Sequence, residues 1–589
     1  MDARPHDEAV AALPGGPEPF AGRGPELAAL RAQAARPAGG RCRLVVVTGR
    51  PGSGRTALAL RFARSQAGDH QLLWAELTAP DGTPAQPGAV ARALLERLGA
   101  GPATGLPDRQ GEDPACGQLR EALVGRSVLL LLDGVADAEQ LRPLLPEEPR
   151  CLVVAVTEGP LTGLAERFRV DPVILRGLDE AAAVELLTAL VGGTRVSCDP
   201  VGAKELVEAC AGRPAPLRLM AGWLRERPKA AVPEAVGALR EAEDDPLRAA
   251  LLLRYRALPV AQARLLRMLT LAPGQRADLR TASALAGCPA PEAAAALHAL
   301  AGAELLDVEP PAADGTPRYR VPGRLHAELV TLRGELDRPA EQQLGRARLV
   351  ERLVRLVESA RALLDEDAAG APDPLPGPLR LRGAAHAAQW LAGEREVLLA
   401  AAEEAVDRAD LDGSAGRLVS SLLRALPAVG EPAAADRYRL HGLVLVLAER
   451  QGAPRRAAAA LLNLGDLRAA AGQWEAAAAH YRAAAEHARQ PLDEPARARA
   501  VEGAAECYRA LGDPVRAADW FLRALALRQA LDEPAAQARL LARTAEAHAA
   551  QRRFEEAARE YRAALALLRR LGDERGTTVV TAALERLRG

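Results

Sequence analysis

The sequence has very little lysine, few aromatic residues and no long apolar run. Lys204 and Lys229 are its only lysines, so nearly all of the 76 basic residues are arginine. Aromatic residues make up 3% of the chain, and aliphatic runs such as 128–132 fall far short of the roughly 20 residues that a membrane helix needs. The net charge of −1 supplies no overall attraction to nucleic acid or to an anionic membrane. We therefore expect no membrane span and no direct nucleic-acid binding.

Cysteine is also sparse and irregularly placed. The seven cysteines are odd in number, and none shows the CxxC spacing of a zinc or redox site. This pattern favours buried thiols in a reducing compartment over a disulfide framework. The first eight residues are polar and lack the apolar segment of a signal peptide. Together these absences predict a soluble, cytoplasmic protein.

The 589 residues exceed the size of one core, so we expect three or four domains. From about residue 43, short β-branched or aliphatic runs alternate with helical segments, which is typical of a parallel, doubly wound α/β sheet. Beyond Leu178 the chain reads as helical, apart from a possible β-ribbon between Leu305 and Val321. The expected strands are Leu44–Val47, Gln71–Leu77, Ser127–Leu132, Cys151–Val156 and Val173–Leu175.

The last third of the chain repeats with a period of 40 residues. Three sets of positions share this period: Ala477, Ala517 and Ala557; Tyr481, Phe521 and Tyr561; and Ala484, Ala524 and Ala564. The small–aromatic–small order places an aromatic ring between helices that alanine allows to approach closely. This register resembles the tetratricopeptide repeat and predicts an α-solenoid. The alternative is an alanine-rich helical bundle without repeats.

A glycine-rich turn follows the first expected strand. The segment 49–56 has the P-loop spacing of two glycines followed by a cation and a hydroxyl residue, with an expected strand before it and a helix after it. Glycines let consecutive backbone N–H groups surround phosphate oxygens, and a helix N-terminus adds a positive dipole end. The alternative is a glycine-rich turn without a ligand. The expected phosphate contacts are Gly49, Gly52, Ser53, Gly54, Arg55 and Thr56.

A carboxylate follows a second aliphatic strand. Asp133 comes directly after the run 128–132, so it should lie at the carboxyl edge of the sheet near the P-loop. Hydroxyl and carboxylate oxygens are ligands that Mg²⁺ prefers. We therefore predict that Thr56 and Asp133 hold Mg²⁺ beside a bound ADP or ATP.

In this order the motifs resemble the STAND-class P-loop NTPases of the NB-ARC type with C-terminal tetratricopeptide repeats, as in bacterial AfsR-like regulators, here without their separate DNA-binding activator domain. The resemblance implies that Gly22 and Arg23 lie over the adenine and that Pro214 of a helical lid packs on it. It also implies a winged-helix domain over about Leu247–Leu306, acting as an internal clamp. The expected domains are 1–17 disordered, 18–178 nucleotide-binding, 179–243 helical lid, 244–330 winged helix, 331–450 helical linker and start of the solenoid, and 451–589 a solenoid of three repeats.

Several positions depart from the family pattern. Arg55 replaces the P-loop lysine and differs from it in shape and hydration. The segment 157–159 reads Thr-Glu-Gly where the family has a phosphate-sensing arginine, so a carboxylate should face the triphosphate. Gly134 follows Asp133 where a second acid or polar residue is usual, and Pro322-Gly323 replaces the family's His-Asp pair, which His326 lies too far along to restore. These changes predict slow or absent ATP hydrolysis.

Two functions remain open. One is a nucleotide-binding regulator of signal transduction or transcription that acts through protein contacts of its repeats and is at most a slow ATPase. Nucleotide exchange would then control its assembly into homo-oligomers. The other is a scaffold that works through the repeats and carries a nucleotide-free relic of the P-loop module.

Overall fold

A computed structural model of the chain describes residues 13, 18–37, 41–78, 83–100, 106, 113–164, 168, 171–312, 314–365, 375–430, 434–489 and 493–587. The segment expected to be disordered, 1–17, lies outside this set apart from Leu13. The chain forms two compact units, and each is described by itself. The first contains Met1–Ala103, Pro107–Glu404 and Arg424–Glu431; the second contains Thr104–Leu106, Ala405–Leu423 and Pro432–Gly589.

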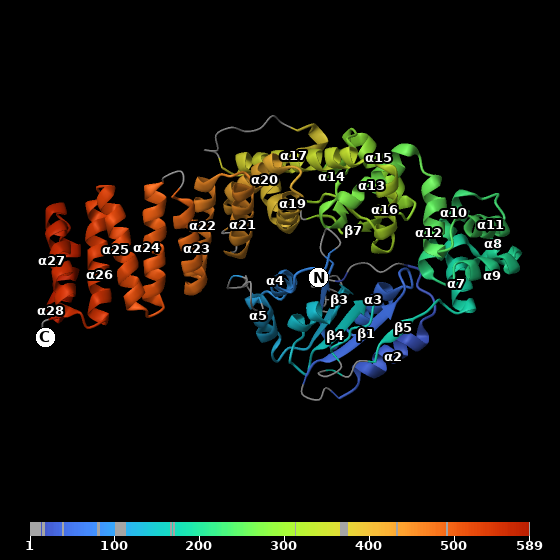
Figure 1. The fold of residues 1–589 in the computed structure, drawn as a ribbon. Coiled ribbons are helices and arrows are strands. Elements are labelled where there is room, and N and C mark those ends of the chain that lie inside the picture. The colour runs from blue at the N-terminus through green and yellow to red at the C-terminus, as the bar shows by residue number, and fades with distance from the viewer. Residues whose placement is uncertain are drawn as a thin grey trace. The chain divides into compact units, whose positions relative to one another are not determined.

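The first unit begins with an α/β module whose five strands are parallel, in the order β2-β3-β4-β1-β5 (Figure 1). Its elements are α2 (Gly24–Ala34), β1 (Arg43–Gly49), α3 (Arg55–Ser65), β2 (Gln71–Glu76), α4 (Pro87–Arg97), α5 (Pro114–Leu123), β3 (Val128–Val135), α6 (Ala138–Leu141), η1 (Arg142–Leu144), β4 (Leu152–Thr157) and β5 (Val173–Leu175). All five expected strands are present, and the parallel α/β prediction is confirmed.

Strand periodicity determines which helices cover which face of this sheet. Successive side chains point to opposite faces, so alternate residues of β3 contribute to separate cores. Leu129 and Leu131 pack with α2 and α3, whereas Leu130 and Leu132 pack with α4 and α5. The sheet is thus the middle layer of three, and its strands are apolar on both faces because both are buried.

The rest of the first unit is mainly helical. It comprises α7 (Glu180–Val191), α8 (Gly193–Cys198), α9 (Pro200–Ala209), α10 (Pro214–Glu226), α11 (Val232–Ala242), α12 (Pro246–Arg256), α13 (Val260–Met268), η2 (Leu269–Leu271), η3 (Pro273–Gln275), β6 (Arg276–Ala277), α14 (Leu279–Ala286), α15 (Ala290–Gly302), β7 (Asp307–Glu309), β8 (Arg318–Arg320), α16 (Gly323–Leu336), α17 (Pro339–Leu364), η4 (Gly377–Leu379) and α18 (Ala384–Gly393).

The expected β-ribbon between Leu305 and Val321 is present as the antiparallel pair β7 and β8. A third strand, β6, pairs with β8 and was not predicted from the sequence, because two residues are too short to show a strand pattern. The run α13, β6, α14, α15, β7, β8 gives three helices and a three-stranded sheet in the region where a winged helix is expected. The winged-helix assignment itself stays a prediction.

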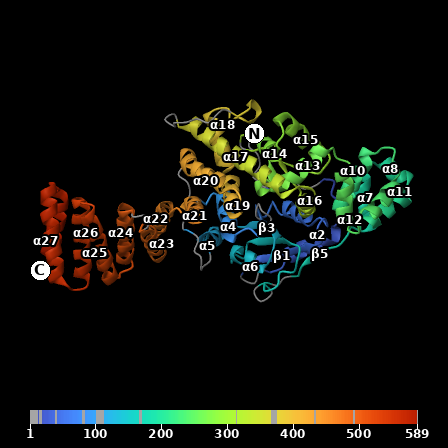
Figure 2. The same ribbon diagram turned by 45° about the horizontal axis from the view of Figure 1, so that its top comes forward.

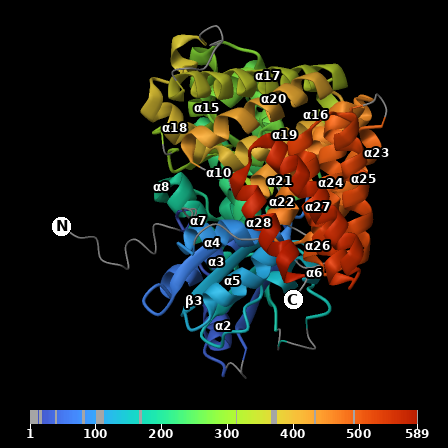
Figure 3. The same ribbon diagram turned by 90° about the vertical axis from the view of Figure 1, so that its left-hand side faces the viewer.

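Two helices, α19 (Arg395–Asp407) and α20 (Asp412–Ala425), and η5 (Leu426–Val429) precede the repeats. The second unit then continues with α21 (Ala434–Arg450), α22 (Pro454–Ala470), α23 (Trp474–His487), α24 (Glu494–Ala510), α25 (Pro514–Ala530), α26 (Pro534–Ala550), α27 (Phe554–Leu571) and α28 (Glu574–Arg586). Figure 2 shows the helix pairs following one another, and Figure 3 views this array from its C-terminal end.

Local signals define the helices of the solenoid. Asp493 and Asp513 accept hydrogen bonds from backbone N–H groups of α24 and α25, and proline occupies the first turn of each helix. Gly472 and Gly512 have φ of 72°, and Arg552 adopts φ of 62° at the equivalent turn. These positions end the first helix of each pair with a left-handed residue.

The 40-residue register is confirmed by burial. The aromatic residues Tyr481, Phe521 and Tyr561 are buried, as are the six alanines of the register. Tyr481 shows why small residues are required, because a Cβ added to Gly465 or Gly503 would lie 2.7 or 2.8 Å from its ring. The ring therefore packs directly on the backbones of α22 and α24, and its hydroxyl donates to Asp466 at 2.7 Å.

Candidate nucleotide-binding site

The P-loop lies between β1 and α3, as the sequence predicts. Gly52 and Gly54 have φ of 79° and 91°, which only glycine adopts readily. Gly54 is the N-cap of α3, and no side chain caps the helix there. The first N–H groups of α3 therefore lack a side-chain acceptor, which is the arrangement that an anion satisfies at a helix N-terminus.

Two buried arginines hold the loop from outside. Arg23 donates to the carbonyl oxygen of Ser53 at 2.9 Å and to that of Arg176 at 2.7 Å. Arg213 donates to the carbonyl of Pro51 at 3.2 Å and to the carboxylate of Asp245 at 2.6 Å. The carbonyl groups of Pro51 and Ser53 thus accept hydrogen bonds from arginine side chains, which fixes the backbone of the loop.

The segment around Gly22 and the start of α10 are both in contact with neighbours of this loop. A Cβ on Gly22 would lie 2.6 Å from the Cβ of Ala182 in α7, so the chain passes there with no room for a side chain. The backbone N–H of Ala215 donates to the carbonyl of Gly52 at 3.2 Å, and Pro214 lies 3.6 Å from the position of a Cβ on Gly54. The structure therefore brings Arg23 and Pro214 to the P-loop.

Ser53 and Gly49 form the inner wall of the loop. Ser53 is 1% exposed, and its Oγ has no hydrogen-bond partner among the described residues. A Cβ on Gly49 would lie 2.8 Å from that Oγ and 2.8 Å from the carbonyl oxygen of Leu175, so glycine is required. A buried hydroxyl without a partner beside an uncapped helix fits a phosphate group.

Thr56 in α3 and Asp133 in β3 meet although β4 lies between β3 and β1, the strand that precedes the P-loop. The Oγ1 of Thr56 donates to Oδ1 of Asp133 at 3.2 Å. No cluster of three or more histidine, cysteine or acidic side chains suitable for a metal occurs among the residues that the structure describes. A hydroxyl and one carboxylate fit Mg²⁺ only if phosphate oxygens and water supply its other ligands, as is common for nucleotide-bound Mg²⁺.

The environment of Asp133 includes two charged residues that sequence reasoning missed. The pKa of Asp133 is raised to about 6, chiefly by burial and also by Glu76, while the hydrogen bond from Thr56 and the charges of Arg320 and Arg55 oppose the rise. Glu76 ends β2 and is the register partner of Asp133. It could have been found by the argument used for Asp133, since both acids follow an apolar run of a buried strand. Arg320 carries no such signal.

Arg55 and Glu158 form one ion pair. The guanidinium of Arg55 lies 2.7 Å from the Glu158 carboxylate and donates to the carbonyl of Thr157 at 2.9 Å. From the sequence we expected Arg55 and Glu158 to weaken nucleotide binding separately, with Glu158 repelling the triphosphate. The structure instead gives Glu158 a partner, so the carboxylate neutralises the cation expected to bind phosphate.

The residues around Gly134 leave no space for a side chain at this position. Its φ is 75°, and a Cβ there would lie 2.5 Å from Oγ1 of Thr78. A second acid after Asp133 therefore has no space in this conformation.

Pro322 is the N-cap of α16, and His326 lies one turn inside that helix. The pKa of His326 is lowered by burial and by the charges of Arg333 and Arg320. No described hydrogen bond connects His326 to the P-loop.

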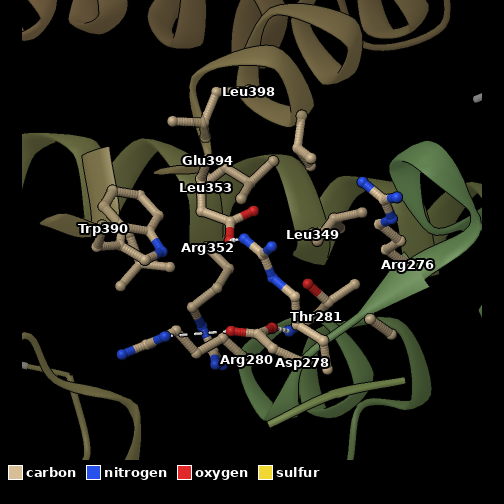
Figure 4. A pocket seen from close by; sticks show the side chains of 14 residues that line it. Arg276, Asp278, Arg280, Thr281, Leu349, Arg352, Leu353, Trp390, Glu394 and Leu398 are labelled. Atoms are coloured by element: carbon tan, nitrogen blue, oxygen red, sulfur yellow. Dashed lines mark hydrogen bonds and ion pairs between the residues drawn. The ribbon is translucent and has the colours of Figure 1, made fainter. Parts of the chain in front are cut away.

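A separate pocket lies between α14, α17 and the end of α18, among residues that Figure 4 shows. Two of its arginines are paired with acids that also line it: Arg280 with Asp278 at 3.2 Å, and Arg318 with Glu394. We interpret it as a structural ion-pair network.

No described helix is both long and apolar enough to cross a membrane.

Comparison with known proteins agrees with this arrangement. Residues 19–170 match the AAA ATPase domain family, and residues 456–530 match the tetratricopeptide repeat. The chain is 30% identical over 501 residues to the regulatory protein AfsR of Streptomyces griseus, covering 80% of this chain and 49% of that protein. It is 32% identical over 331 residues to AfsR of Streptomyces coelicolor, covering 54% of this chain and 32% of that protein. The chain thus spans half or less of the length of these relatives.

Among solved structures, the fold is similar to a signal transduction ATPase with numerous domains that carries a tetratricopeptide repeat sensor, from Pyrococcus horikoshii. The TM-score is 0.38 at 14% identity, over 97% of this chain and 86% of that one.

Proposed function

Because the chain is homologous to AfsR regulatory proteins and joins an AAA ATPase domain to tetratricopeptide repeats, we propose that it is a nucleotide-binding regulatory protein. It holds ADP or ATP in the P-loop and acts through contacts between its solenoid and a protein partner. The observation that carries the proposal is the loop 49–56, whose uncapped helix and buried Ser53 hydroxyl lie beside the Thr56–Asp133 pair.

Different residues of the site would bind the phosphate groups and Mg²⁺. The N–H groups at the start of α3 and the Ser53 hydroxyl would bind phosphate oxygens. Thr56 and Asp133 would hold Mg²⁺, which neutralises phosphate charge when it is bound. Arg23 and Arg213 keep the loop in shape, since each donates to a loop carbonyl. Repeats of this kind present extended concave surfaces, which supports a protein partner for the solenoid. Nucleotide-dependent homo-oligomerisation belongs to the same proposal.

The residues also support slow or absent hydrolysis. Gly134 offers no side chain to orient water, and Thr78 leaves no room for one. Arg55 is engaged by Glu158 and the carbonyl of Thr157, so a phosphate must compete with a carboxylate for the guanidinium. The same ion pair favours the alternative function, a nucleotide-free scaffold, because it satisfies the P-loop cation without any ligand.

The first experiment is to denature the purified protein and identify any released nucleotide by chromatography. Thermal unfolding with ADP or ATP, each with and without Mg²⁺, then measures binding by the wild-type protein. Ligand at about 100 times its Kd should add about 2.7 kcal/mol. Absence of released nucleotide together with no stabilisation at millimolar concentration would support the scaffold function.

Glu158→Gln tests the role of the ion pair. Removing the competing carboxylate should raise nucleotide affinity by about threefold to tenfold, and more for ATP than for ADP because of the extra phosphate charge. Glu139→Gln is the matched control, since it makes the same charge change at an exposed position of α6. Equal affinities of the two variants would contradict competition between Glu158 and phosphate.

A further inference from the structure

Glu76 is a carboxylate at the nucleotide edge that no recognised motif assigns. It ends β2 and is paired in register with Asp133 of β3, so both side chains leave the same face of the sheet on neighbouring strands. It is also close enough to Asp133 to raise that residue's pKa. Its position at the carboxyl edge is where parallel α/β sheets bind ligands.

Glu76 is held by an arginine from a distant part of the same unit. Nη2 of Arg320 donates to Oε1 of Glu76, and its Nη1 lies 3.9 Å from Glu309. The Arg320 side chain is 16% exposed and that of Glu76 30%, so the pair is largely shielded from water. Arg320 is fixed in place because β8 pairs with both β6 and β7 at this residue.

The sequence has no second acid directly after Asp133 to accept a proton from the attacking water, and Glu76 lies beside Asp133 on the neighbouring strand. Gly134 cannot supply a carboxylate, and Asp133 is engaged with Thr56. Among the described acids, Glu76 is the register neighbour of Asp133, and Thr78, the residue that closes the space at Gly134, lies two positions after it. A carboxylate that accepts hydrogen bonds from a guanidinium is stabilised in its charged form but is a poor acceptor for a water proton.

We propose that Glu76 is the general base of ATP hydrolysis in this protein and that Arg320 is a positioning residue which holds Glu76 inactive. This rests on the proposed function, since it requires ATP in the P-loop. When Arg320 withdraws, water attacks the γ-phosphorus and forms a P–O bond. The bond from that phosphorus to the bridging oxygen breaks with its electron pair remaining on ADP, and the water proton passes to the Glu76 carboxylate, which later releases it to solvent.

The proposal gives β8 a function in the fold. Any movement of the β6–β8–β7 sheet that withdraws Arg320 would free Glu76, so the segment would control hydrolysis rather than nucleotide binding. The family pattern has a phosphate-sensing arginine at 157–159 and a His-Asp pair at 322–323, and this sequence has neither. In the proposal, Arg320 supplies a different cation at the same edge of the sheet. Arg320 lies two residues before Pro322.

The test compares Arg320→Ala with the double variant Arg320→Ala/Glu76→Gln in the full-length protein with Mg²⁺ and ATP. Single-turnover hydrolysis should rise at least about tenfold in Arg320→Ala, with ATP affinity changed less than about threefold, and return to the wild-type rate in the double variant. Arg320→Lys should restore the slow rate by keeping the pair. The matched control Arg318→Ala removes a different arginine–glutamate pair from the same strand and should leave hydrolysis unchanged.

A pH profile separates this role from a structural one. The hydrolysis rate of Arg320→Ala should depend on pH, and this dependence should vanish in the double variant, which lacks the Glu76 carboxylate. Should Arg320→Ala fail to fold, Arg320→Met keeps the apolar stem and gives the same comparison. An Arg320 variant that binds ATP but hydrolyses it no faster than wild type would overturn the proposal, as would activation that persists without Glu76. If the wild-type protein and Glu158→Gln bind no ATP, the proposed function fails instead.

Discussion

The P-loop edge of the first unit and the repeat array of the second are built from different interactions. In the array, alanine and glycine let an aromatic ring such as Tyr481 pack on neighbouring backbones, and each helix pair contacts its successor. At the P-loop edge, charged side chains form ion pairs between different elements, as in Arg55–Glu158 and Arg320–Glu76. The array uses apolar packing that recurs every 40 residues, whereas the edge uses single charged residues that do not recur. The two regions are therefore held together by different residue types.

The largest expected effect tests the packing side of this comparison. Phe521→Ala should destabilise the array by about 3–5 kcal/mol, because the ring is fully buried and its loss leaves a cavity between α24, α25 and α26. Phe554→Ala is the matched control, since Phe554 is 51% exposed and should lose less than about 1 kcal/mol. Thermal unfolding followed by circular dichroism measures both. Equal losses would break the link between the register and stability.

An intermediate effect concerns the charge side. The pKa of Asp133 is about 6 in the folded protein and 3.8 ordinarily, so the native state binds this proton more tightly than the unfolded state. The contribution of Asp133 to stability is therefore greatest below about pH 4 and is lost as pH rises through 6. Without nucleotide, Asp133→Asn should be more stable than wild type at pH 7 by on the order of 2 kcal/mol, and this gain should shrink toward pH 4.

Chemical denaturation of the wild-type protein and Asp133→Asn across pH 4 to 8 checks this expectation. A difference in stability that stays constant over the range would contradict the raised pKa. The same variant should also lose any Mg²⁺-dependent part of the stabilisation by nucleotide, which would distinguish the electrostatic cost of Asp133 from its proposed use.

The smallest effect sharpens the steric argument at the edge. Gly134→Ala and Gly125→Ala both place alanine at a left-handed φ, 75° and 73°, and each should lose about 1 kcal/mol from that strain. Only Gly134 meets a neighbour, the Oγ1 of Thr78, so its variant should lose about 1 kcal/mol more. Thermal unfolding compares the two, and the excess should disappear when Gly134→Ala is combined with Thr78→Ala. An equal loss at both glycines would show that space is available after Asp133.

Much of the fold was predictable because its signals are local. The strands 44–47 and 173–175 are short β-branched or aliphatic runs, and they form β1 and β5. Strand β6 was missed because its two residues owe their pairing to β8 rather than to their own pattern. In the site, Gly52, Gly54 and Asp133 lie where their motifs predict, whereas Glu76 and Arg320 went unrecognised.

By itself, the sequence determined the P-loop turn, the alternation of strand and helix, and the 40-residue register, because each depends on residues close together in the chain. Backbone sterics, strand periodicity and helix caps act over a few positions, so their residue types remain legible. Only the tertiary structure decided which charges meet. Arg55 and Glu158 are 103 positions apart, and Glu76 and Arg320 are 244 apart. An ion pair acts through space and leaves no spacing in the chain, so the partners of Arg55 and Glu76 could be identified only after folding had brought them together.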